Sequence, residues 1–581
     1  MKALRGFPPA PVPLAAAARG AVALAVPLLV GVWTATPVPA VIAGIGALWG
    51  VSQDGPDPYR LRVRRLGCMG LWAALGLLAG ELALRSGHPA AVTVCLVAVA
   101  LLAGAISLRG RLASVSGMHL LLGATIGGGI PLPGPWWHAP LALLAGVGLV
   151  IVLSGAPWLW RRHAIERSAV LAVYRAASQA LSAAGTPAAE DARRRLTAAL
   201  DHAHQVMGRH LAPRARVRGE LDALRGAFHT AVRLGEVTSA LVWEGRPLPR
   251  HVTEVPLLMA ARLLPRPGGA AGSAGPDPVD HAPGRAVFRT DLDSPGLRAL
   301  AGLSAEAGRA RPDEAPVRLP AYPWHGRAAQ VRYTVLLAVC VLVAQLCAEL
   351  LHGPRGYWLP MTVAFVYKPD FGPVFRRALH RCAGTVVGVA AIGAVTLLTT
   401  DAYVLIGAVA AFGALMAVGV RHHYALATTG LTAIVLVLVY MLGDHRALYG
   451  ARILDTALAA AIVLVAHFAL WPRSAAERAA AQTEAALAAA RRYRDLAPGA
   501  AAVQRHALRR AAYHRLAEAR RAVAHARGEP GRPDRELADR EDAIASAERM
   551  CDAVSARTLG AGPVPFPRPV PRRAAAGPVG G

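Results

Sequence analysis

The feature that most constrains this chain is a series of apolar runs, many of them long enough to cross a lipid bilayer. A helix needs about 20 apolar residues to span the hydrocarbon core. The runs fall into two clusters of six, and those at 38–52 and 357–367 are short or rich in Gly and Pro. The sequence therefore predicts an all-α integral membrane protein with about twelve transmembrane helices, at 14–33, 38–52, 66–84, 89–108, 112–130, 137–157, 333–351, 357–367, 382–400, 402–420, 424–442 and 453–471.

The charge of the chain does not indicate a nucleic-acid partner. The net charge is +27, from 63 Lys and Arg against 36 Asp and Glu. Lys2 and Lys368 are the two lysines, and the arginines gather at the ends of apolar runs without a basic stripe interleaved with aromatic residues. With the N-terminus inside the cell, four basic residues fall in outer loops and most others on inner flanks, as the positive-inside rule favours. The outer four are Arg85, Arg355, Arg446 and Arg452.

This topology predicts a multi-pass protein of the cell membrane with both termini in the cytoplasm. Two long polar segments, about 161–327 and 473–581, are then cytoplasmic as well. The basic and apolar N-terminus resembles a secretory signal. We interpret it as an uncleaved first helix, because a corresponding helix precedes the second cluster.

Motifs for catalysis, metals and cofactors are missing from the sequence. Neither lysine follows the glycines of a phosphate-binding loop, and neither HExxH nor GxSxG on a strand-to-helix turn occurs. The pairs His202 with His204 and His422 with His423 lack partners at metal spacing. The 6 cysteines lie mostly inside apolar runs without a CxxC pair. We expect no enzyme activity, no cofactor and no metal.

An internal repeat links the two clusters of helices. The hairpin after the second run contains Asp54, Tyr59, Arg60 and Arg65, and the hairpin after the eighth contains their counterparts. The offset is constant, since 370 − 54 and 381 − 65 both equal 316. Because each cluster has an even number of spans, we expect two parallel repeats related by an axis along the membrane normal, with a pathway between them. The counterparts are Asp370, Phe375, Arg376 and Arg381.

The apolar clusters and polar segments predict four parts. Residues 1–160 and 327–472 are the six-helix membrane domains. Residues 161–326 form a helical cytoplasmic domain with a flexible linker near 265–284, where the composition cannot bury a core. Residues 473–581 form a second helical cytoplasmic domain that ends in a disordered proline-rich tail.

The stretch from Gly356 to Gly388 contains the main candidate site. An apolar run ends at Lys368, Pro369 and Asp370 and resumes after a cluster of arginines. Lys368 is either an anion contact at the inner mouth of a pathway or a positive-inside anchor paired with Asp370. The same two interpretations apply to the arginines, with the anchor favoured. These are Arg376, Arg377 and Arg381.

Other residues at membrane depth are candidates of a different kind. Gly384 and Gly388 have the small-xxx-small spacing that lets helices approach closely in lipid. Arg452 and Asp455 are three residues apart and could form a buried pair on one helix face. Asp455 or His467 could carry a proton that couples transport to the proton gradient.

These residues together carry a family resemblance. The segments Tyr357 to Val363, Lys368 to Gly372 and Phe375 to Gly388 resemble the signature of the fusaric acid resistance (FUSC) family, as does the last apolar run with Arg452, Asp455 and Trp471. That family includes exporters of aromatic carboxylic acids and is related to plant aluminium-activated malate transporters. The resemblance covers most of the chain in outline, with its specific motifs in about 356–472.

The resemblance implies a secondary transporter that exports organic anions, with Tyr357 and Trp358 among the pathway candidates. An organic-anion channel is an alternative within the same class. A membrane-anchored scaffold, whose cytoplasmic helices recruit partners, is the alternative of another class. By analogy with the plant channels a homodimer is expected, with the lipid bilayer and a small organic anion as the other partners and no nucleic acid.

Overall fold

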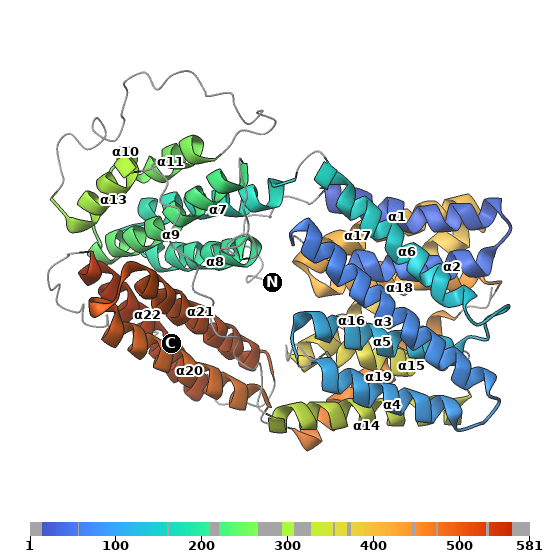
Figure 1. Ribbon diagram of the computed structural model, residues 1–581. Helices are drawn as coiled ribbons and strands as arrows, with labels where there is room; N and C mark the ends of the chain where they lie inside the picture. Colours follow the sequence, from blue (N-terminus) through green and yellow to red (C-terminus); the bar gives the residue numbers. More distant parts are fainter. Residues whose placement is uncertain are drawn as a thin grey trace, which may run out of the picture. The chain divides into compact units, whose positions relative to one another are not determined.

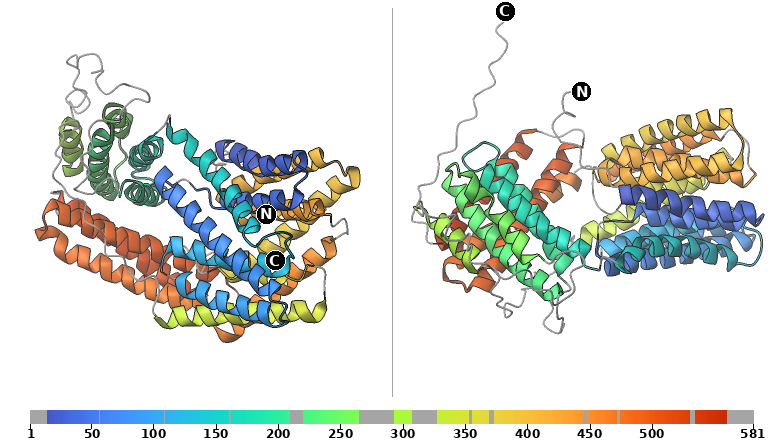
Figure 2. Two further views of the ribbon diagram at one scale, coloured as in Figure 1. Left: turned by 45° about the vertical axis from the view of Figure 1, so that its right-hand side comes forward. Right: turned by 90° about the horizontal axis from the view of Figure 1, so that it is seen from above.

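The computed structural model describes residues 14–55, 57–107, 109–159, 162–208, 220–264, 293–306, 327–352, 355–368, 373–443, 448–471, 474–529 and 534–559. All regular secondary structure in these ranges is helical (Figures 1 and 2). They divide into two compact units. The membrane unit comprises 1–165, 320–482 and 520–540, and the polar unit comprises 166–319, 483–519 and 541–581.

Twelve helices of the membrane unit correspond to the twelve predicted runs. Their bounds are α1 Leu14–Trp33, α2 Pro37–Ser52, α3 Tyr59–Arg85, α4 Ala91–Ser107, α5 Arg111–Gly129, α6 His138–Gly155, α14 Arg327–Leu351, α15 Trp358–Val366, α16 Val374–Leu398, α17 Ala402–His422, α18 Tyr424–Met441 and α19 Tyr449–Leu470.

Helix length separates these twelve into two groups. Among the described residues, nine helices are long and apolar enough to cross a membrane. The other three, α2, α4 and α15, have 16, 17 and 9 residues. The all-helical membrane architecture is therefore confirmed, while the count of twelve spans stays a prediction. The nine residues of α15 extend about 14 Å, well short of the bilayer core.

The helices of the first cluster pack in the same pairs as those of the second. Helix α3 packs on α5 as α16 packs on α18, and α2 packs on α6 as α15 packs on α19. The contacts between clusters are matched too: α1 packs on α17, and α14 packs on α4. Figure 1 shows α1 beside α17 and α14 beside α4.

Glycines allow the closest of these contacts. A Cβ atom added to Gly76 of α3 would lie 1.9 Å from the Leu120 carbonyl oxygen of α5, and one added to Gly123 would lie 2.1 Å from that of Ala73. On α16, a Cβ at Gly384 would lie 2.6 Å from the Ala425 oxygen. Bare backbone at these crossings gives the close van der Waals contact on which helix association in lipid depends.

The polar unit contains helices from both polar segments. Those of the first segment are α7 Ala164–Ser182, α8 Ala189–Met207, α9 Glu220–Glu244, α10 Arg250–Thr253, α11 Val255–Leu263 and α13 Pro295–Glu306. Those of the second are α20 Ser474–Leu496, α21 Ala502–Arg527 and α22 Asp534–Thr558, each of which runs from one unit into the other.

Buried ion pairs join the two polar segments. Arg193 of α8 lies 2.7 Å from Glu548 and 3.0 Å from Asp552 of α22. The Tyr513 hydroxyl of α21 donates to Asp552 over 2.5 Å. The sequence predicted one helical domain after each membrane half. In the structure, 483–519 and 541–581 of the second segment share the polar unit with 166–319, while 520–540 belongs to the membrane unit. The reason is that each segment has a buried apolar and charged face that the other covers.

The predicted linker at 265–284 and the proline-rich tail lie outside the described residues.

Candidate functional site

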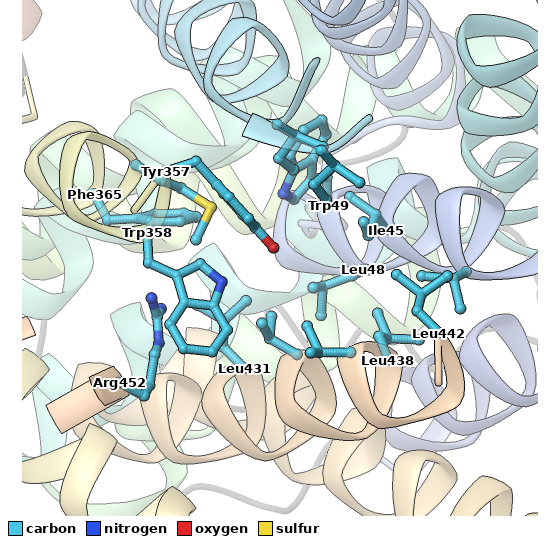
Figure 3. A pocket seen from close by; sticks show the side chains of 16 residues that line it. Ile45, Leu48, Trp49, Tyr357, Trp358, Phe365, Leu431, Leu438, Leu442 and Arg452 are labelled. Carbon is cyan, nitrogen blue, oxygen red and sulfur yellow. The ribbon is translucent and has the colours of Figure 1, made fainter. Parts of the chain in front are cut away.

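A pocket lies where helices of the two clusters meet in the membrane unit. Side chains of α2, α5, α15, α18 and α19 surround a cavity of about 40 Å³. Figure 3 shows Ile45, Leu48 and Trp49 of α2 on one side and Leu431 and Leu438 of α18 on another. This volume holds a few waters at most, so a larger ligand requires these side chains to move apart. The lining is Val41, Ile45, Leu48, Trp49, Ile126, Ile130, Tyr357, Trp358, Met361, Phe365, Leu431, Val435, Leu438, Val439, Leu442 and Arg452.

Arg452 is the one cation in this lining. Its side chain is fully buried at 0% exposure, and its guanidinium lies 5.0 Å from the centre of the Trp358 ring (Figure 3). None of its three guanidinium nitrogens has a hydrogen-bond partner among the described residues, and neither does the indole Nε1 of Trp358. A buried charge without acceptors is costly, so this end of the pocket favours an anionic ligand.

Arg381 is a second buried arginine close by. It lies on α16 with 1% exposure, and its guanidinium is 4.7 Å from the centre of the Phe365 ring, which lines the pocket. Arg381 and Arg452 are near enough to interact electrostatically. Arg381 adds to the positive charge of this region, while Asp455 acts on Arg452 in the opposite sense.

Lys368 lies at the C-terminal end of α15, half-buried, with its ammonium 5.7 Å from the centre of the Tyr424 ring. Arg377 donates to the Val366 carbonyl over 3.2 Å. Lys368, Arg377 and Arg381 all act electrostatically on the half-buried Tyr424. The structure thus brings three predicted basic residues together around a tyrosine.

The corresponding residues of the first cluster are held by carboxylates. Asp54 is 2.6 Å from Arg19 of α1 and 3.3 Å from Arg62 of α3. Arg65, the counterpart of Arg381, pairs with Asp57 and donates to the Gln53 carbonyl. In the first hairpin Arg62 and Arg65 thus have acidic partners, whereas no such pair is found for the second hairpin among the described residues, which do not include Asp370.

The remaining predicted site residues are dispersed. Asp370 lies outside the described residues. Arg376 and Arg60 are exposed, and Tyr59 is 5.5 Å from the Arg62 guanidinium. Asp455 is half-buried and forms no ion pair with Arg452 in the described structure. On α19, His467 is buried with its ring 5.9 Å from that of Tyr367.

Sequence reasoning missed several residues of the site. Tyr424 and Phe365 contact the basic side chains, and Trp49 brings an aromatic ring from the first cluster. No sequence pattern pointed to these residues, because aromatic residues are common in apolar runs. His119, buried on α5 with its ring 5.5 Å from that of Trp49, was missed for the same reason.

The fold and the pocket define the class: a multi-span α-helical membrane protein with buried cations between its helices. Residues 335–466 match the family model described as "Fusaric acid resistance protein-like". The chain thus carries a domain of that family, as the resemblance implied.

Among the curated proteins similar to this chain, one is named a membrane protein. An uncharacterized membrane protein of Bacillus subtilis, YvaC, is 24% identical over 475 residues, which cover 78% of this chain and 72% of the relative. The uncharacterized protein slr1298 of Synechocystis is 33% identical over 119 residues, 20% of this chain and 15% of that protein. YhfK of Escherichia coli is 32% identical over 145 residues, 24% and 20% of the two chains. No solved structure matches the chain.

Proposed function

We propose that this protein transports organic anions, in particular aromatic carboxylates, out of the cell through a pathway between its two clusters of helices. The observation that carries the proposal is Arg452: a fully buried guanidinium with no hydrogen-bond partner among the described residues, facing an apolar pocket with aromatic rings. An aromatic carboxylate complements both parts, since its carboxylate satisfies the cation and its ring packs on apolar side chains.

The proposed pathway depends on a duplicated architecture. We infer twelve spans in two parallel repeats, 1–160 and 327–472, with cytoplasmic termini in the cell membrane. The matched packing pairs of the two clusters support the duplication, as does the 316-residue offset. In such folds, ligands bind near the midplane where the repeats meet. The pocket receives side chains from both clusters, as this arrangement requires.

Lys368 is proposed to collect anions at the inner mouth. The lysine is half-buried at the end of α15 and lies in a group of cations whose described neighbours include no carboxylate. A mobile ammonium here attracts an anion without holding it as firmly as a bidentate guanidinium would.

Efflux of a labelled aromatic acid, such as benzoate, tests the proposal in cells that lack the native gene and express each variant. Arg452→Gln should lower the efflux rate about tenfold, because it removes a charge-assisted contact worth about 1.5–3 kcal/mol. Lys368→Ala should lower it by a smaller factor. Arg60→Gln is the matched control, an exposed arginine of the first hairpin, and should leave efflux unchanged.

Protein levels in the membrane should be equal for all variants. Wild-type efflux by Arg452→Gln would contradict the assigned site, and a wild type that moves no acid of an aromatic and aliphatic panel would contradict transport. An uncoupler separates the two mechanisms: a secondary transporter stops when the proton gradient is removed. A channel instead continues to pass the anion down its own electrochemical gradient.

A further inference from the structure

Three buried polar groups near the inner end of α16 have atoms without a well-aligned hydrogen bond in the described structure, although Arg381 and Tyr424 interact with each other and Tyr424 interacts with Thr428. They are Nε and Nη2 of Arg381, the hydroxyl of Thr385 one turn further along the same helix, and the hydroxyl of Tyr424 at the start of α18. Arg381 and Thr385 are each 1% exposed. The guanidinium can only donate hydrogen bonds, and both hydroxyls can do so.

Charge compensation is also missing at this place. The groups that act electrostatically on Arg381 include Tyr424 and Cys382 but no described carboxylate. Lys368 and Arg377 add positive charge around Tyr424. Burying a cation in this way costs several kcal/mol unless something neutralises it.

In the first cluster of helices, the arginine equivalent to Arg381 has an acidic partner. Arg65 stands at the position equivalent to Arg381 and is 6% exposed, and it pairs with the Asp57 carboxylate. Position 373, equivalent to Asp57 at the same offset, is a proline. The second cluster has therefore kept the buried arginine without the acidic side chain that balances it.

We propose that a small inorganic anion, such as a halide, binds permanently between Arg381 and Tyr424 and takes the place of the missing carboxylate. The site differs from the organic-anion pocket: neither Arg381, Thr385 nor Tyr424 lines that cavity, and the Phe365 ring lies against Arg381 while also lining the pocket. Neither of the described cavities is lined by Arg381, so we expect an ion that is compact enough to fit beside its guanidinium. The proposal does not depend on organic-anion transport.

Thermal unfolding of the purified full-length protein in detergent tests this site with bromide as the probe. Replacing sodium gluconate by sodium bromide at constant ionic strength should raise the apparent Tm by about 3 °C or more, and the rise should saturate, because the ion binds the folded state alone. In Arg381→Met the rise should vanish. Arg65→Met, the matched control from the first cluster, should lower the Tm but keep the bromide effect.

Tyr424→Phe serves as a second variant that leaves every charge in place. It should raise the bromide concentration at half-effect about fivefold, as expected for the loss of one hydrogen bond. The proposal is overturned if the wild-type Tm ignores bromide, or if Arg381→Met and Tyr424→Phe respond to bromide as the wild type does. Benzoate efflux is measured separately, so a failure of the transport proposal leaves this result unaffected.

Discussion

Charged side chains that are buried in this protein are balanced in different ways at different positions. Arg62 and Arg65 of the membrane unit have carboxylates within ion-pair distance, and Arg193 of the polar unit has two. Among the described residues, no carboxylate lies within ion-pair distance of Arg381 or Arg452, although Asp455 acts electrostatically on Arg452. Because an uncompensated charge at depth is retained only where it serves a purpose, these two arginines are where ligands are to be sought.

His514 of the polar unit gives a prediction for pH. Its Nδ1 is 3.1 Å from Asp201 and its Nε2 is 3.4 Å from Glu518, and hydrogen bonds to these two carboxylates raise the pKa of His514 to about 9. A raised pKa means that the folded state favours the protonated imidazole. The stabilisation is therefore complete below about pH 6.5 and is lost as the pH rises through about 9.

The size of this effect is about 1 kcal/mol after allowance for solvent screening. The wild-type apparent Tm should fall between pH 7 and 9.5, whereas His514→Gln should have a lower Tm at pH 7 and a flatter profile. His202→Gln, an exposed histidine of α8, is the control and should behave as wild type. Parallel profiles for His514→Gln and the wild type would show that this contact does not contribute.

At the scale of elements, helix packing in the membrane unit depends on glycines at the helix crossings. Gly76 and Gly67 are both on α3, but a Cβ at Gly76 would lie 1.9 Å from the Leu120 oxygen, while nothing lies within 4 Å of one at Gly67. Gly76→Ala must push α3 and α5 apart, since backbone cannot yield as a flexible side chain can. Gly67→Ala adds a methyl group into open space.

We expect Gly76→Ala to destabilise the protein by about 1–3 kcal/mol, as overpacking does. Gly67→Ala should be neutral or slightly stabilising because alanine favours helix. Thermal unfolding in detergent at one scan rate compares the two variants. Equal Tm values would mean that the α3 and α5 crossing relaxes without cost.

Helices could be predicted from the sequence far better than the site. Apolar runs placed all twelve helices of the membrane unit, because helix formation in lipid is dictated by local composition. The predicted run at 357–367 already indicated a short helix, and α15 spans Trp358–Val366, ending three residues before Pro369 in the sequence. Arg452 was identified from charge at membrane depth, and Lys368 and Arg381 from the basic hairpin, where an anchor role was favoured for Arg381. Tyr424 and Phe365 were not identified, because which apolar side chain meets a cation is settled by tertiary packing.

At the scale of the molecule, the polar unit is built from two segments that are far apart in the chain. Deletion of 473–581 therefore removes α20, α21 and α22, and with them the two carboxylates that pair with the buried Arg193. We expect the remaining part of the polar unit to unfold, so that limited proteolysis cuts within 166–264 much faster than in the full chain. Unchanged proteolysis would show that the first segment folds alone.

This expectation affects how a scaffold is distinguished from a transporter. Loss of a phenotype after the deletion does not identify a scaffold, because the deletion damages both polar segments. The double variant Arg193→Met with Asp552→Leu changes the polar unit without deleting any helix. Replacing a buried charged pair by apolar residues is often tolerated. Both substituted residues lie in the polar unit.

The matched contacts between α1 and α17 and between α14 and α4 have a consequence for the history of the chain. Such contacts are those of two identical subunits around a two-fold axis, where every substitution appears twice. On the proposed duplication, fusion of the two copies ended that constraint. One copy could then keep an aspartate at position 57 while the other acquired Pro373. The two halves would then differ in charge although their helices pack in the same pairs.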